Sequence, residues 1–181
     1  QERSVFSSTE FWSLNPPDQP GFQLTSATEA ISLRIDPTGK AFVKLNAAFV
    51  GNSPETVVTQ IVAEALTLKP SDVSVGYADA DAGFSGRGPG GSRYTVMVTG
   101  AVVAAARTLR EKLFKLTAHM MECDAGDLEL RNGKIGVKGV PDLEKSIAEV
   151  AAASHYFRLD FPDEPGFESG LQTTAVYDHP L

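Results

Sequence analysis

The sequence predicts an α+β fold, with mixed sheets and one long amphipathic helix. Apolar residues alternate with polar ones on both sides of the turn Asp36-Pro37-Thr38-Gly39, which is typical of a β-hairpin. An apolar stripe at helical spacing runs from Tyr94 to Glu122, which predicts a long helix with one buried face. The dipeptide Asn132-Gly133 favours a second hairpin. Hairpin, helix, strand, loop, helix, hairpin and helix, in that order, make an α+β pattern.

The composition is that of a globular protein with an acidic surface. Its 181 residues are 42% hydrophobic and 22% charged, enough for one good core. A net charge of -7 argues against nucleic acid or an anionic membrane as the main partner. The single cysteine, Cys123, cannot form an internal disulfide, which favours a cytoplasmic setting. No apolar run approaches the roughly 20 residues of a membrane span, and residues 1–8 do not have the order of a signal peptide.

The first half of the chain is predicted to contain an arm, a hairpin, a helix and a strand. Residues 1–24 combine prolines with bulky aromatics, which indicates an irregular arm or a linker. The hairpin spans Ile31 to Leu45. Pro54-Glu55 suits a first helical turn, and helical spacing of apolar residues continues up to Lys69-Pro70, which ends the helix. A short strand is predicted over Asp72 to Gly76.

The second half is predicted to contain a functional loop, the long helix, a hairpin, a helix and a strand. Residues 82–91 include five glycines and a proline, too many for regular structure unless the backbone bends or approaches a ligand. Two short strands, 128–130 and 134–137, flank the Asn-Gly turn. An amphipathic helix is predicted over 143–153 and a strand over 171–177. The apolar stripe of the long helix consists of Val98, Val102, Ala105, Leu109, Leu113, Leu116 and Met120.

Two loops that come directly before predicted helices share one chemistry. The first is Gly51 to Thr56 and the second is Gly86 to Arg93. Exposed amides at a helix N-terminus, glycines that permit close approach and a nearby arginine form a site for phosphate or another anion. A tight turn followed by a helix cap explains the same residues, since short glycine motifs often match by chance. The residues by themselves leave both interpretations open.

Four segments, taken in order, carry a resemblance to a known family. They are Gly51-Asn52-Ser53-Pro54-Glu55-Thr56 with Gln60-Ile61, then Asp72-Val73-Ser74-Val75, then Ala78-Asp79-Ala80-Asp81, then Gly86-Arg87-Gly88-Pro89-Gly90-Gly91-Ser92-Arg93. In this order they resemble the molybdopterin-binding large subunit of the molybdenum hydroxylases, the family of xanthine dehydrogenase, aldehyde oxidase and aerobic carbon monoxide dehydrogenase. The resemblance covers about residues 25 to 180, including Glu164-Pro165-Gly166.

The resemblance implies a site for a molybdenum–molybdopterin cofactor, expected as the cytosine dinucleotide. In the family the matching loops contact the pterin and its nucleotide tail mostly through backbone amides, with help from serine and arginine. The cofactor-binding residues implied in this way are Gly51, Asn52, Ser53, Gly90, Gly91, Ser92, Arg93 and Tyr94. Departures from the family pattern occur at Asn52, Ser53 and Pro89-Gly90, where glutamine, glycine and threonine with its following residue are usual. They either tune the loops to one nucleotide form of the cofactor or mark a lobe that has lost it.

The resemblance also implies an activity for the larger protein. The family hydroxylates an aldehyde, an N-heterocycle or a similar small substrate, or oxidises CO, with water as the oxygen source. Its partners are the remainder of the large subunit and subunits or domains that carry iron–sulfur clusters and FAD. Residues 25–181 are expected to form one incomplete molybdopterin-binding lobe, since the family's catalytic glutamate lies beyond Leu181 and its substrate loop before Gln1. No catalytic residue is assigned, and the isolated chain is expected to be inactive; the alternative is a non-catalytic scaffold or split-off subunit of the same fold.

No metal site is predicted from side chains of this chain. His119, Glu122, Cys123 and Asp124 stand close together at the end of the long helix, at spacings that could suit metal ligands. A structural zinc ion needs four good ligands, and the same residues make an ordinary polar helix end. This second interpretation is adopted.

Overall fold

The computed structural model describes residues 28–46, 50–78, 86, 88–89, 93–140 and 142–177. Predictions for the arm 1–24 and for most of the loop 82–91 therefore lie outside the described residues. The described part folds into two sheets and three α-helices, connected by short 3-10 turns, which confirms the α+β prediction. None of the helices in these ranges combines the length and the apolarity required to cross a membrane.

The larger sheet is mixed and has the strand order β3-β2-β1-β7. Strands β1 (Glu29–Ile35) and β2 (Ala41–Leu45) form the predicted hairpin, and β7 (Leu171–Tyr177) pairs antiparallel with the other edge of β1. Strand β3 (Val73–Tyr77) runs parallel to β2. All four strands were predicted from the sequence, β3 one residue earlier, as Asp72 to Gly76. Alternate residues of β1 and β2 point inward and are fully buried: Ile31, Leu33, Ile35, Ala41, Val43 and Leu45.

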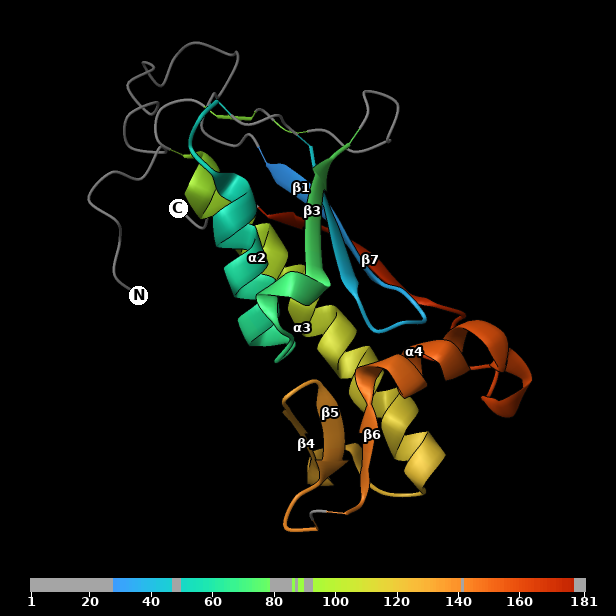
Figure 1. Cartoon of the computed structure of the whole chain (residues 1–181). Helices are drawn as coiled ribbons and strands as arrows, with labels where there is room; N and C mark the ends of the chain where they lie inside the picture. Colours follow the sequence, from blue (N-terminus) through green and yellow to red (C-terminus); the bar gives the residue numbers. More distant parts are fainter. Residues whose placement is uncertain are drawn as a thin grey trace, which may run out of the picture.

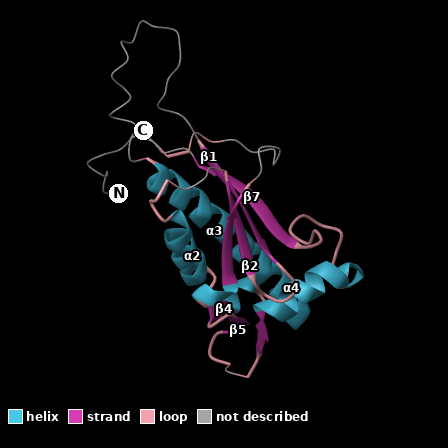
Figure 2. Ribbon diagram, turned by 45° about the horizontal axis from the view of Figure 1, so that its top comes forward, coloured by secondary structure: helices cyan, strands magenta, loops and turns pink. Residues whose placement is uncertain are grey.

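Two helices cover the inward face of this sheet (Figures 1 and 2). Helix α2 (Pro54–Ala65) connects the parallel strands β2 and β3, and α3 (Tyr94–Met121) packs against α2, β1 and β7. The predicted apolar stripe of α3 is confirmed, because its members from Val98 to Leu116 are buried. Helix α2 ends before the predicted Lys69-Pro70. Thr67 has a left-handed backbone conformation there, and the Leu68 N–H donates to the Ala63 carbonyl at 2.9 Å, which closes the helix early.

The smaller sheet is antiparallel and lies beside the C-terminal half of α3 (Figure 1). Strands β4 (Leu128–Arg131) and β5 (Lys134–Val137) form the second predicted hairpin, and the turn residues Asn132 and Gly133 both have positive φ, as a type I′ turn requires. The third strand, β6 (Glu144–Ser146), pairs with β5.

The predicted start of the last helix was wrong. Residues 144–146 are a strand, and α4 covers Ile147–Tyr156. The Ser146 hydroxyl accepts a hydrogen bond from the Glu149 N–H at 3.1 Å, and the Glu149 carboxylate accepts one from the Ser146 N–H at 2.7 Å. This reciprocal capping box fixes the helix start at Ser146, so the residues before it are free to pair with β5.

Candidate functional site

Both predicted loops lead to helices that begin at the same end of the larger sheet. Leu45 pairs with Tyr77 and Glu29 pairs with Tyr177, so the ends of β2, β3 and β7 and the start of β1 lie together. Helices α2 and α3 begin at this end as well (Figure 1). The first N–H groups of a helix have no partner within the helix and carry partial positive charge. Two such groups of donors are therefore presented at one end of the fold.

The loop before α2 is exposed and its backbone is shaped by two left-handed residues. Gly51, Asn52 and Ser53 are all exposed, and both Gly51 and Ser53 have positive φ. The Asn52 side-chain oxygen accepts a hydrogen bond from the Val50 N–H at 3.2 Å. The side chain of Ser53 makes no capping hydrogen bond to α2, in contrast to Ser146 on α4. The amides of the first turn of α2 are thus not satisfied by their N-cap side chain.

Before α3, the arginine nominated by the family resemblance is buried in an internal ion pair. Arg93 is 3% exposed, and its guanidinium contacts the carboxylate of Glu29, which is 0% exposed. The same carboxylate oxygen of Glu29 accepts the Gly88 N–H at 2.9 Å, and its other oxygen accepts the Asn46 side-chain amide at 2.7 Å. Arg93 also donates to the Gly88 carbonyl at 3.1 Å. The positive charge of Arg93 is therefore neutralised within the fold.

The structure thus places five of the eight sequence-nominated residues, in two groups. Gly51, Asn52 and Ser53 form an exposed loop, while the side chains of Arg93 and Tyr94 are buried. The segment 90–92, with Gly90, Gly91 and Ser92, lies outside the described residues. Sequence reasoning did not nominate Glu29 or Asn46, which hold the second loop. The sequence did contain one indication: Glu29 stands at the same alternating spacing as Ile31 and Leu33, which face inward from β1. A buried acidic side chain needs a hydrogen-bonding or ionic partner.

Tyr94, the first residue of α3, lies near two acidic residues at this end of the sheet, Glu29 and Glu55. Burial, followed by the negative charges of Glu29 and Glu55, raises the pKa of Tyr94 to about 12 from its ordinary value of 10.0. Glu55, in the first turn of α2, accepts a hydrogen bond from the Tyr77 hydroxyl. The phenol of Tyr94 is therefore held neutral, since its ionised form would be desolvated beside two carboxylates.

This shift predicts a loss of stability in alkali. The pKa of Tyr94 is higher in the folded state than in the unfolded state. Its contribution to the free energy of unfolding is therefore complete below pH 10 and is lost as the pH rises from 10 towards about 12. The reason is that the phenol ionises first in the unfolded chain. Urea unfolding across this range should show a weaker pH dependence for Tyr94→Phe than for the unchanged protein. Tyr156→Phe is the matched control, since Tyr156 is 70% exposed. Equal pH dependence of the two variants would refute the assignment.

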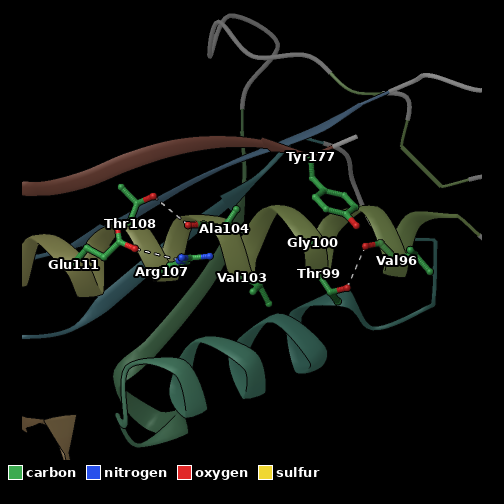
Figure 3. Close-up of a pocket in the computed structure, with 9 residues that line it drawn as sticks. All are labelled: Val96, Thr99, Gly100, Val103, Ala104, Arg107, Thr108, Glu111 and Tyr177. Atoms are coloured by element: carbon green, nitrogen blue, oxygen red, sulfur yellow. Dashed lines mark hydrogen bonds and ion pairs between the residues drawn. The ribbon is translucent and has the colours of Figure 1, made fainter. Parts of the chain in front are cut away.

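A groove of about 810 Å³ runs along the exposed side of α3 (Figure 3). It is lined by Val96, Thr99, Gly100, Val103, Ala104, Arg107, Thr108, Glu111 and Tyr177. The Tyr177 ring lies so close to Gly100 that a methyl group on this glycine would come within 2.5 Å of it. The charged side chains of the groove, Arg107 and Glu111, pair with each other at 3.1 Å. A ligand in the groove would therefore meet mainly small or apolar side chains, and the two charged side chains that line it are paired with each other.

The helix-end residues considered as metal ligands are not brought together. Within the described ranges, no group of three or more His, Cys, Asp and Glu residues is placed to hold a metal ion. The Nε2 atom of His119 lies 3.0 Å from the Asp160 carbonyl oxygen. Burial, then the nearby Asp127 and Asp124, raise the pKa of the Cys123 thiol, which disfavours the thiolate form that binds metals.

Comparison with known proteins identifies similar chains. A family model described as the molybdopterin cofactor-binding domain matches residues 6–180. The carbon monoxide dehydrogenase large chain of Afipia carboxidovorans is 32% identical over 155 residues, which are 86% of this chain and 18% of that protein. The 6-hydroxypseudooxynicotine dehydrogenase complex subunit gamma of Paenarthrobacter nicotinovorans is 38% identical over 151 residues, 82% of this chain and 18% of the relative.

Solved structures show the same fold. Quinoline 2-oxidoreductase from Pseudomonas putida 86 superposes with a TM-score of 0.75 at 34% identity, covering 84% of this chain and 19% of that one. Reconstituted CO dehydrogenase from Oligotropha carboxidovorans gives a TM-score of 0.75 at 32% identity, covering 84% and 18%. The chain therefore spans less than one fifth of the length of these relatives.

Proposed function

Because the chain belongs to the molybdopterin cofactor-binding domain family, we propose that its two helix-start loops hold part of the cofactor of a molybdenum hydroxylase. The observation that carries the proposal is the meeting of the α2 and α3 N-termini at one end of the sheet, with the exposed loop Gly51–Ser53 before one of them. Helix N-termini with glycine-containing loops bind phosphate groups through backbone amides. The nucleotide tail of the cofactor supplies such groups.

The roles of the individual residues follow from their exposure. Asn52 uses its side-chain oxygen within its own loop, which leaves the amide nitrogen to donate to the cofactor. Gly51 and Ser53 provide backbone donors, and we extend the same role to the segment 90–92. Arg93 and Tyr94 contribute through their backbone and by fixing the start of α3, since their side chains are buried. This arrangement suits an anion whose charge is balanced mainly by amide dipoles.

The residues present fit a dinucleotide form of molybdopterin, and we propose the cytosine dinucleotide. The Ser53 side chain makes no capping hydrogen bond to α2, so the first amides of α2 are not occupied by an N-cap side chain. When bound, the molybdenum–pterin group supplies the redox chemistry that inserts oxygen from water into a substrate. The contribution of this chain is to bind and orient the group.

We further propose that the larger protein is one subunit of an oxidoreductase complex. The relatives include a carbon monoxide dehydrogenase large chain and a subunit of a 6-hydroxypseudooxynicotine dehydrogenase complex, which supports partner subunits; we propose that these carry the iron–sulfur clusters and FAD. The substrate would be a small molecule such as an aldehyde, an N-heterocycle or CO. We place the complex in the cytoplasm, which agrees with a single cysteine in 181 residues.

The test is to measure molybdenum and released nucleotide in the full-length protein purified with its partner subunits. We expect a near-stoichiometric amount of both, with cytidine nucleotide released by acid. Asn52→Ala should weaken retention of the nucleotide about three- to tenfold, the usual effect of one lost hydrogen bond. Gln60→Ala, an exposed amide side chain on α2, should have no effect. Absence of molybdenum and nucleotide in the assembled wild-type complex would contradict the proposal and leave the non-catalytic scaffold.

A further inference from the structure

We propose that Glu29 is a positioning residue for the cofactor-binding loop before α3. It lies at the start of β1 and is 0% exposed. Its partners come from two other segments of the chain: Asn46 directly after β2, and Gly88 with Arg93 before α3. This inference rests on the proposed function, because the loop that Glu29 holds is one of the two assigned to the cofactor.

The carboxylate of Glu29 holds the loop at two points. One is the Gly88 N–H, at 2.9 Å, and the other is the guanidinium of Arg93, the last residue before the helix. Arg93 donates in turn to the Gly88 carbonyl at 3.1 Å. The peptide groups on both sides of Gly88 are thereby fixed to the same ion pair. Charge-assisted hydrogen bonds of this kind are about twice as strong as neutral ones.

Gly86 shows how closely the loop is seated against this carboxylate. A methyl group at Gly86 would lie 1.6 Å from the Asn46 side-chain nitrogen and 2.2 Å from a Glu29 carboxylate oxygen. An added methyl group therefore requires that the ends of the Asn46 and Glu29 side chains, or the backbone at Gly86, move from these positions. Glycine is therefore the residue that lets the backbone lie against Glu29 and Asn46 without displacing their hydrogen-bonded side chains, at a position where no positive φ demands a glycine.

The consequence for binding is that the start of α3 is held in place before the cofactor arrives. Donors that are fixed in advance bind an anion more tightly than donors that must be ordered on binding, since the ordering entropy is not lost at that step. Glu29 does this from behind the loop, fully buried, without contacting the cofactor. Its role is distinct from that of the exposed residues Gly51–Ser53, which are assigned to contact.

The experiment compares two pairs of variants in the full-length, partner-assembled protein. Glu29→Gln removes the charge but keeps the size of the side chain, and Gly86→Ala prevents the loop from seating. The matched control for the second is Gly76→Ala in β3, where an added methyl group meets nothing within 4 Å. Leu113→Ala, a buried core change on α3, controls for loss of stability alone. The readouts are retained nucleotide, Tm and amide hydrogen exchange of peptides that cover Gly86 to Tyr94.

We expect Glu29→Gln and Gly86→Ala to weaken nucleotide retention about tenfold or more and to accelerate exchange at the start of α3. Leu113→Ala should lower the Tm without changing nucleotide retention well below the Tm, and Gly76→Ala should change neither. Wild-type amide hydrogen exchange and wild-type nucleotide retention in both Glu29→Gln and Gly86→Ala would overturn the proposal. So would nucleotide retention that falls in proportion to the Tm across all four variants, Leu113→Ala included. If the wild-type protein holds no nucleotide, the proposed function fails, whereas the exchange measurement still decides whether Glu29 holds the loop.

Discussion

Arg93→Ala should lower the free energy of unfolding by about 3–5 kcal/mol, the usual cost of leaving one member of a buried ion pair without its partner. Glu29 is 0% exposed and Arg93 is 3% exposed, so the carboxylate that loses its partner lies away from bulk solvent. The carboxylate would keep the hydrogen bonds from Asn46 and the Gly88 N–H, but it would lose its counter-charge. Urea denaturation of the purified chain at neutral pH measures this difference.

Two further variants separate charge from packing in this experiment. Arg107→Ala removes one member of the exposed Arg107–Glu111 pair, whose side chains are 81% and 67% exposed, and should cost less than about 1 kcal/mol. The double variant Glu29→Leu with Arg93→Met replaces the ion pair by apolar side chains and should recover much of the lost stability. A double variant that is no more stable than Arg93→Ala would show that the unpaired charge is not the cause.

Leu113→Ala should lower the free energy of unfolding by about 2–5 kcal/mol, as observed for buried leucines in general. Leu113 is 0% exposed and belongs to the core on α3, the helix that contacts β1, β7, α2 and α4. A cavity there removes apolar contacts from the core of the fold. Val103→Ala on the same helix is the control, since Val103 is 53% exposed, and should change stability by less than about 0.5 kcal/mol. A similar loss in both variants would contradict this account.

The fold could be predicted wherever local periodicity determined the structure. The strands of both hairpins and the long helix follow from period-2 and period-3.6 patterns, and the Asn132-Gly133 turn follows from the positive φ that it requires. Strand β6 was missed because Glu144 and Lys145 lack the apolar alternation of a strand. Its end was nevertheless encoded, since Ser146 and Glu149 have the spacing of a capping box.

The candidate site could be predicted only in part. The loop 51–53 and the start of α3 follow from glycine, helix-start and family patterns. The buried role of the Arg93 side chain could not be predicted, because its partner Glu29 lies 64 positions earlier in the chain and no local pattern joins the two. The local sequence around Arg93 is compatible both with an exposed arginine that binds an anion and with a buried arginine that forms an ion pair. Only the tertiary structure distinguishes them.

The place of β1 between β2 and β7 has a consequence for synthesis. Its two neighbours come from opposite ends of the described chain: β2 follows at once, whereas β7 begins at Leu171. A growing chain on the ribosome therefore has α2, α3 and the hairpin available long before β7. Until then β1 has an open edge, and the part of α3 that β7 covers remains in water. Open strand edges and uncovered apolar helix faces are the features that promote aggregation of unfinished chains, so β7 protects this edge of the nascent protein once it has emerged and paired with β1.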